Sequence, residues 1–305
     1  MTSPAPIRSS PPDNWAHQAL LKDVREALYS LPSYFRTQTN IEGISATDIF
    51  TLNAALGAAI ENQVVETLNQ MRSVWDPNEQ YALYSFRRQS QTFPDVLLRR
   101  STAEEGSADD IILGIELKGW YLLAKEGEPS FRFQVTPAAC APQDLIVVVP
   151  WVLSNVIAGE PKVFSPYIEV AKYAAEYRNY HWTELRRTQS DRSIVSPVNV
   201  MPYPTKSDRI ADVPRSDTGG NFGRYARTGL MDNYLAQARG ELLCGIKAEH
   251  WLHFFKIFQE QKSTELIRAE IEAMRARISS TEQNADPQRI ALIGIINHLE
   301  TFLDA

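Results

Sequence analysis

The chain has 305 residues, is 44% hydrophobic and carries a formal net charge of −6. This length supports one large domain or a core with a smaller appendage. The negative total excludes a uniformly basic coat for nucleic acid, although it still allows a locally positive cleft. The only two cysteines, Cys140 and Cys244, exclude a disulfide framework.

No segment predicts insertion into a membrane. The longest apolar run, Leu145–Leu153, is far too short to span a bilayer, and the N-terminus lacks the charged and apolar pattern of a signal peptide. We therefore expect a soluble protein of the bacterial cytoplasm. Residues 1–13 are rich in Pro and Ser, which predicts a disordered tail.

Two helices are predicted before the first strand. One covers residues 14–31 and ends before a proline, and a longer one covers about 45–73, where Ser45 and Asp48 have the spacing of a capping box. Glu61 lies beside the apolar stripe of the longer helix and is a candidate functional acid, and Glu66 is a second candidate. Each is equally well interpreted as an ordinary charge at the boundary of an amphipathic helix.

The middle of the chain is predicted to form a β-sheet. Strands are predicted at 81–87, 93–100 and 111–120, and the last two would form a hairpin. The continuous apolar run 145–151 predicts a central strand covered on both faces. A further strand is expected at 163–169, followed by a helix that ends near residue 185.

One of these strands carries charge on an otherwise apolar run. Side chains alternate between the two faces of a strand, so Glu116 and Lys118 point to the same face, away from Ile115 and Leu117. Such charges are costly unless they are paired, bound to a metal or catalytic. Gly114 leaves room for another segment to approach this strand closely. The alternative is an ordinary surface pair, which contributes little.

The preceding apolar segment contains Pro94-Asp95. Glu-x-Lys occurs three times in the chain, but only the copy at 116–118 lies on a strand pattern and follows a Pro-Asp. This arrangement, over roughly residues 50–155, resembles the signature of the PD-(D/E)xK nuclease superfamily, which includes the type II restriction endonucleases.

The resemblance implies a Mg²⁺-dependent phosphodiesterase that leaves 5′-phosphates. It places the metal on Asp95, Glu116 and the Leu117 carbonyl, and Lys118 beside the attacking water, with Glu61 as a further acid. Some exonuclease branches of the superfamily carry a Tyr four residues after a Gln, whereas the residue at that spacing from Gln134 is Ala138, which favours an endonuclease.

The irregular stretch 186–218 is basic and rich in proline. Long irregular segments are often functional, so it is predicted either to wrap DNA or to serve as a plain connector. A glycine-rich turn then leads into a predicted helix, where backbone N–H groups would suit a phosphate; a plain helix entry is equally consistent. The candidate DNA-binding residues of both segments are Arg186, Arg187, Arg192, Lys206, Arg209, Arg215, Asn221, Arg224 and Arg227.

The sequence therefore predicts an α/β fold with a central mixed sheet flanked by helices. A restriction-endonuclease-like core is expected at 14–200, and a loop with a helical C-terminal subdomain at 201–305, for DNA contact or dimerisation. The predicted function is sequence-specific cleavage of double-stranded DNA by a homodimer acting on a palindrome.

Three alternatives remain open from the sequence. The first is a non-catalytic DNA-binding module on the same scaffold, and the second is a nonspecific or repair nuclease. The third is an unrelated metal enzyme that uses Asp208, Asp212 and Asp217, although their uneven spacing matches no metal-binding loop.

Overall fold

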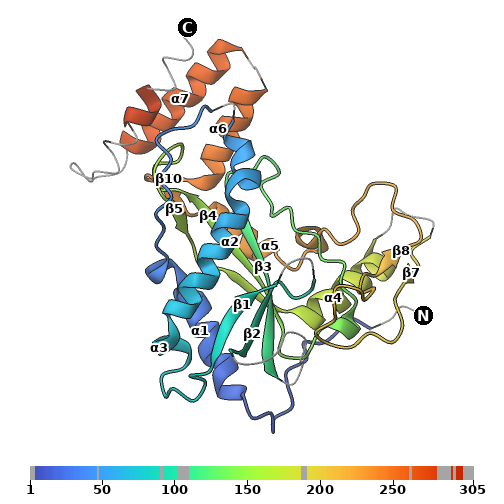
Figure 1. Ribbon diagram of the computed structural model, residues 1–305. Coiled ribbons are helices and arrows are strands. Elements are labelled where there is room, and N and C mark those ends of the chain that lie inside the picture. The colour runs from blue at the N-terminus through green and yellow to red at the C-terminus, as the bar shows by residue number, and fades with distance from the viewer. Residues whose placement is uncertain are drawn as a thin grey trace.

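The computed structural model describes residues 4–46, 48–89, 92–101, 110–186, 191–260, 263–279, 290 and 293–297. These residues form a mixed sheet flanked by helices, as Figure 1 shows, so the predicted α/β class is confirmed. Within them, no helix is long and apolar enough to cross a membrane.

The main sheet mixes antiparallel and parallel pairs. Its strands are β1 (Tyr84–Arg88), β2 (Val96–Arg100), β3 (Ile111–Tyr121), β4 (Leu145–Leu153), β5 (Pro161–Val163) and β6 (Tyr167–Val170). The order is β1-β2-β3-β4-β5, and β6 also pairs with β4. The predicted hairpin is present, because β2 and β3 run antiparallel with Val96 opposite Ile115.

Strand β4 lies parallel to β3 and forms the centre of the sheet. Every residue from Leu145 to Leu153 is buried, as the continuous apolar run predicts. A parallel pair requires a crossover, and residues 122–144 supply it. They include a short 3₁₀ turn, η3 (Pro137–Ala139).

The first helices differ from prediction at their ends. Helix α1 (Gln18–Tyr34) continues past Pro32, which lies in its last turn. Helix α2 (Leu52–Gln70) begins later than predicted, after the 3₁₀ turn η1 (Ile49–Thr51), and neither element has a side-chain cap. The backbone N–H of Asp48 instead donates to the Ser45 carbonyl, so the expected capping box is not formed. A short helix, α3 (Arg72–Trp75), follows α2.

The second half of the chain contains helices and a long irregular segment, residues 191–218, which we call the arm. Helix α4 (Ala171–Tyr180) ends in a π-helical turn, η4 (His181–Leu185), and the short pair β7 (Ile194–Val195) and β8 (Val213–Pro214) lies in the irregular segment. Figure 1 shows this segment extending to one side of the sheet. The remaining elements are η5 (Tyr225–Thr228), α5 (Asp232–Arg239), β9 (Leu242–Leu243), β10 (Ile246–Lys247), α6 (Ala248–Gln259) and α7 (Thr264–Ser279).

Residues 4–13 follow a defined path, whereas their composition predicts disorder. The Arg8 guanidinium donates to the Glu169 carboxylate at 2.8–3.1 Å and lies 4.7 Å from the centre of the Tyr173 ring. These contacts attach the segment to the edge of the sheet. The predicted disorder of residues 1–3 falls outside the described residues.

One buried hydrophobic cluster joins the sheet to the C-terminal helices. It includes Leu28 of α1, Val147 of β4 and Phe255 of α6. The core therefore continues across residue 200, where the sequence predicts a boundary between subdomains. The helices that follow η5 pack onto the same core as the sheet.

Candidate active site at the edge of β3

Strand β3 extends beyond the end of β2, which leaves part of its edge without a neighbouring strand. Three alternate N–H groups on this edge donate to side chains instead of to a backbone. The pairs are Leu117 with Asp95 Oδ2 at 3.3 Å, Gly119 with Glu61 Oε1 at 3.1 Å, and Tyr121 with Asn53 Oδ1 at 3.2 Å. Side chains thus satisfy an edge that would otherwise be open to another strand.

Helix α2 supplies two of these acceptors because it lies very close to β3. A Cβ atom at Gly119 would lie 3.4 Å from the Gly57 carbonyl oxygen and 3.7 Å from Glu61 Cγ. Asn53 and Glu61 are about two helical turns apart and so lie on the same broad face of the helix. Helix α2 therefore lies at ordinary contact distance from β3 here, which brings Glu61 to the edge.

A second glycine in β3 positions Asp95. A Cβ atom at Gly114 would overlap the Pro94 ring and would lie 3.0 Å from Asp144 Oδ1. The Gly114 N–H donates to the same Asp144 oxygen at 2.7 Å. The absence of a side chain thus lets the Pro94-Asp95 turn lie against β3, in agreement with the close approach predicted at this position.

Two cations surround the Glu61 carboxylate. Lys118 Nζ lies 3.4 Å from Oε1, and Arg88 Nη2 lies 3.3 Å from Oε2. The Glu61 side chain is only 10% exposed, while those of Lys118 and Arg88 are 30% and 31% exposed. The carboxylate therefore lies inside the cluster and the two cations lie at its solvent side. Sequence reasoning missed Arg88, because its place depends on the register of β1 against β2.

The carboxylates of this edge cluster (Glu61, Asp95 and Glu116) are crowded. Burial and the charge of Glu61 raise the pKa of Asp95 from 3.8 to about 6, although the Leu117 N–H and the two cations act in the opposite direction. Burial, followed by the charge of Asp95, raises the pKa of Glu116 well above its ordinary value. Excess negative charge at a partly buried position is relieved by a proton or by a bound cation.

The donor set fits a hard cation that keeps part of its water shell. Within the described residues, no group of three or more His, Cys, Asp or Glu side chains could hold a metal ion. A cage made only of protein side chains is therefore absent from that part of the chain. Mg²⁺ is commonly held by one or two carboxylates with several waters, and Asp95 and Glu116 are such carboxylates. The Leu117 carbonyl points to the same strand edge as its N–H, which Asp95 accepts.

The other acidic candidates have different surroundings. Glu66 is exposed on α2. Asp212 is buried against Arg178, Asp217 accepts backbone N–H groups of its own turn, and Asp208 accepts from Thr205. Each of these three aspartates is thus engaged locally, which removes the basis for a metal site shared among them.

Gln134 lies outside the edge cluster. Its carbonyl accepts the Asp212 N–H at 2.8 Å. The segment 131–135, which the sequence predicts as a strand, forms only isolated bridges, between Arg132 and Arg224 and between Val135 and Ala211.

The glycine-rich turn before η5 does not offer the phosphate site that its sequence suggests. The N–H groups of Asn221 and Phe222 donate to the Asp217 carboxylate at 2.9 and 3.0 Å. The turn leads into a short 3₁₀ helix, not an α-helix. An anion from outside would therefore have to displace an intramolecular carboxylate.

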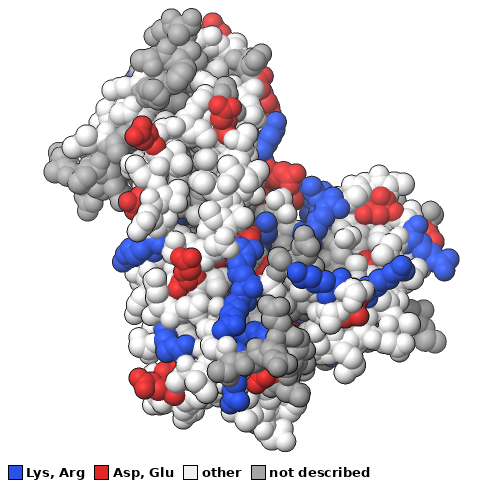
Figure 2. Space-filling model, in the orientation of Figure 1, with Lys and Arg blue, Asp and Glu red and all other residues white. Residues whose placement is uncertain are grey.

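The candidate DNA-binding residues fall into separate groups. Arg186, Asn221, Arg224 and Arg227 line one pocket beside η4 and η5. Lys206 and Arg209 are exposed on the arm, whereas Arg192 and Arg215 lie near β7 and β8. Arg187 lies outside the described residues. Figure 2 shows basic side chains bordering the hollow between the body of the molecule and the arm.

The arm is attached close to the edge cluster. Thr92 Oγ1 donates to the Pro204 carbonyl at 3.3 Å, and the Tyr203 hydroxyl donates to Asp144 Oδ1 at 3.1 Å. Asp144 in turn holds the Gly114 N–H. The segment that carries Lys206 and Arg209 therefore begins beside the Pro94-Asp95 turn.

No protein-family model, curated protein or solved structure matches this chain. The chemistry that the edge cluster can support therefore follows from its own geometry.

Proposed function

We propose that the protein is a Mg²⁺-dependent endonuclease that cleaves double-stranded DNA at specific sequences and leaves 5′-phosphates. The observation that supports this most is the meeting of Asp95, Glu61 and Lys118 at one edge of β3, with Glu116 on the same strand face as Lys118. These groups come from α2, the turn before β2, and β3. An ordinary surface pair would not lie beside two further carboxylates, Asp95 and Glu116, whose pKa values are raised.

In this proposal the acidic residues have two different roles. Asp95, Glu116 and the Leu117 carbonyl hold the cation, which when bound neutralises phosphate charge and lowers the pKa of a water. Glu61 fixes the Lys118 ammonium at 3.4 Å. Lys118 then orients the attacking water and stabilises negative charge that develops on the phosphate.

The proposed substrate is held by the basic groups of the arm and of the pocket beside η5. The protein would act as a homodimer on a palindromic site, in the cytoplasm of a bacterium. Both points follow from the same analogy with restriction endonucleases.

The direct test is incubation of purified protein with plasmid and phage DNA, in millimolar Mg²⁺ or in EDTA, followed by gel electrophoresis. Discrete bands that require the metal would support a site-specific endonuclease, and sequencing of the ends would locate the site. A metal-dependent smear would favour a nonspecific or repair nuclease. Intact DNA across a broad panel of unmodified and methylated substrates would count against catalysis.

A second candidate is a DNA-binding module without catalysis. The observation in its favour is that Asp95, Glu61 and Asn53 satisfy the N–H groups of an open strand edge, which is sufficient structural reason for their positions. Such a module would shift DNA on a gel with strong dependence on salt and would cut nothing.

A further inference from the structure

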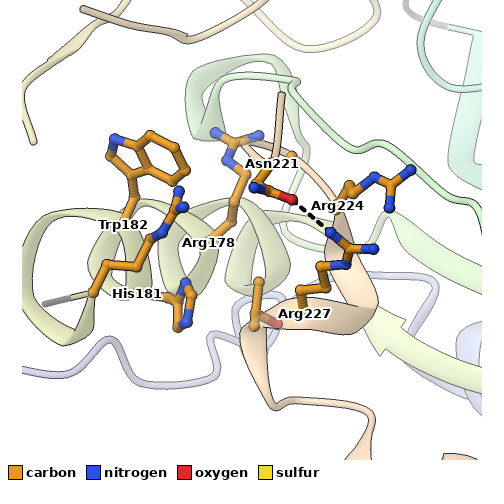
Figure 3. Close-up of a pocket in the computed structure, with 9 residues that line it drawn as sticks. Arg178, His181, Trp182, Asn221, Arg224 and Arg227 are labelled. Atoms are coloured by element: carbon orange, nitrogen blue, oxygen red, sulfur yellow. Dashed lines mark hydrogen bonds between the residues drawn. The ribbon is translucent and has the colours of Figure 1, made fainter. Parts of the chain in front are cut away.

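A pocket of about 280 Å³ lies between the end of α4 and the segment that contains η5. Figure 3 shows Arg178, His181 and Trp182 on the helical side, and Asn221, Arg224 and Arg227 on the opposite side. Arg186 also lines it, so four arginines line one cavity, and no Asp or Glu side chain is among its lining residues. We call this cavity the arginine pocket.

The four arginines are not held equally. Arg178 is buried and donates to the Phe133 carbonyl at 2.7 Å and to Asp212, so its role is structural. Arg224 meets Glu126 at 3.4 Å, with side chains that are 25% and 45% exposed. An ion pair exposed to this extent contributes little to stability. Arg224 can therefore exchange its carboxylate for an external anion at small cost.

Arg227 is held by an amide and a carboxylate, and Arg186 by an aromatic ring. Asn221 Oδ1 accepts from Arg227 Nη1, while Glu128 holds Nε at 2.8 Å. The Arg186 guanidinium lies 4.0 Å from the centre of the Trp182 ring. Within the described residues, the buried Arg186 Nη1 has no hydrogen-bond acceptor. A buried donor in this state gains free energy when an acceptor arrives.

The geometry selects an oxyanion over a nucleobase. Stacking of a base requires an exposed aromatic face. Trp182 is only 3% exposed, because Arg186 covers its ring and Phe222 packs against it at 5.1 Å. The pocket therefore presents guanidinium forks, which match the oxygens of a phosphate group.

A short series of contacts links the pocket to the segment that precedes Asp95. The Phe133 N–H donates to the carbonyl of Gly223, a lining residue, at 2.7 Å. The Phe133 ring packs against Phe93 at 5.8 Å, and Phe93 directly precedes Pro94-Asp95. This aromatic pair therefore connects a lining residue of the pocket with the Pro94-Asp95 turn.

We propose that the arginine pocket binds the phosphate group of a nucleic-acid backbone or of a free nucleotide, with Arg186, Arg224 and Arg227 as its ligands. Asn221 is a positioning residue that orients Arg227. The proposal does not require the edge cluster to be catalytic, because it concerns binding of an anion.

Isothermal titration calorimetry in a buffer without metal or phosphate tests the pocket, with inorganic phosphate as the probe. We expect saturable binding by the wild-type protein and by Arg275→Gln, a control on α7. Arg224→Gln and Arg227→Gln should each weaken binding about tenfold or more, the loss expected for one charged hydrogen bond. Arg227→Lys, which keeps the charge but not the fork, should bind with intermediate affinity. Circular dichroism of each variant checks that it folds.

A duplex oligonucleotide and a deoxynucleoside monophosphate, both titrated in EDTA, distinguish the source of the phosphate. Stronger binding of the duplex, weakened by the same variants, identifies a backbone phosphate. Stronger binding of the mononucleotide, weakened in the same way, identifies a free nucleotide. If the wild type binds none of the three probes, or if both glutamine variants bind them as tightly as Arg275→Gln, the proposal is overturned. These titrations can be told apart from the cleavage gel, because they measure binding in the absence of metal, whereas cleavage also requires the edge cluster.

Discussion

Glu61 combines two roles that an amide substitution separates. Its Oε1 accepts the Gly119 N–H, and its charge holds Lys118 and Arg88. Glu61→Gln keeps an acceptor for the edge of β3 but removes the charge. If the edge cluster is catalytic, cleavage should fall about a hundredfold or more, while urea unfolding changes by less than about 1 kcal/mol. The exposed Glu66→Gln on the same helix is the matched control.

Amide substitutions also separate structure from catalysis at the proposed metal ligands. Asp95→Asn retains an oxygen for the Leu117 N–H, and Glu116→Gln retains the shape of the side chain. Each should abolish cleavage, as should Lys118→Ala, and DNA binding in EDTA should remain close to wild type. Full activity in purified Glu116→Gln would refute the assignment. Loss of cleavage together with loss of folding would instead favour the structural interpretation of the edge.

Asp144 gives a pH dependence that does not involve the proposed metal. Burial raises its pKa from 3.8 to about 7, although hydrogen bonds from Ala141, Gly114 and Tyr203 act in the opposite direction. The folded state therefore binds the proton more tightly than the unfolded chain. The free energy of unfolding should fall as pH rises from about 4 to about 7.

Comparison with Asp144→Asn isolates this contribution. The variant cannot titrate at this position, so the stability difference between wild type and variant should be largest near pH 4 and should shrink as pH rises through about 7. Urea unfolding at several pH values measures it. A difference that stays constant over this range would show that Asp144 does not titrate there.

At the scale of elements, the two glycines of β3 differ in how much space they leave for a side chain. Gly114→Ala would place a Cβ so close to Pro94 Cγ that the two atoms clash, whereas Gly119→Ala would meet Gly57 O at 3.4 Å and Glu61 Cγ at 3.7 Å, which are ordinary contacts. We expect Gly114→Ala to destabilise the fold by about 1–3 kcal/mol, in the range of overpacked cores, and Gly119→Ala to cost less. Urea denaturation of both variants measures this, and equal costs would contradict the argument.

The periodicity of the chain is what made the elements and part of the cluster predictable. A side-chain period of two places Glu116 and Lys118 on one face of β3, and the continuous apolar run identifies β4. The starts of helices were less predictable, because Ser45 and Asp48 form a backbone turn where a capping box is expected. The sequence could not indicate Asn53 or Arg88, since their roles depend on where β2 ends and how β1 pairs with it.

At the scale of the whole molecule, the net charge is negative although basic side chains are exposed locally on the arm. The chain carries a charge of −6, yet Lys206 and Arg209 are exposed on an arm whose base contacts Thr92 and Asp144. Composition alone could not reveal this, because it does not show that residues 203–204 return to the Pro94-Asp95 turn. Residues 4–13 illustrate the same limit, since their composition does not show that Arg8 contacts Glu169 and the Tyr173 ring.

The exposed basic residues of the arm lead to a quantitative prediction about DNA binding. Release of counterions gives a slope of log affinity against log salt that grows with each phosphate neutralised. If Lys206 and Arg209 each contact a phosphate, Lys206→Gln and Arg209→Gln should each reduce the magnitude of this slope by about one and weaken binding to all sequences alike. Fluorescence anisotropy of a labelled duplex in EDTA, over a series of salt concentrations, measures the slope. Arg275→Gln on α7 should leave it unchanged; a slope unaltered in both arm variants would place the DNA elsewhere on the molecule.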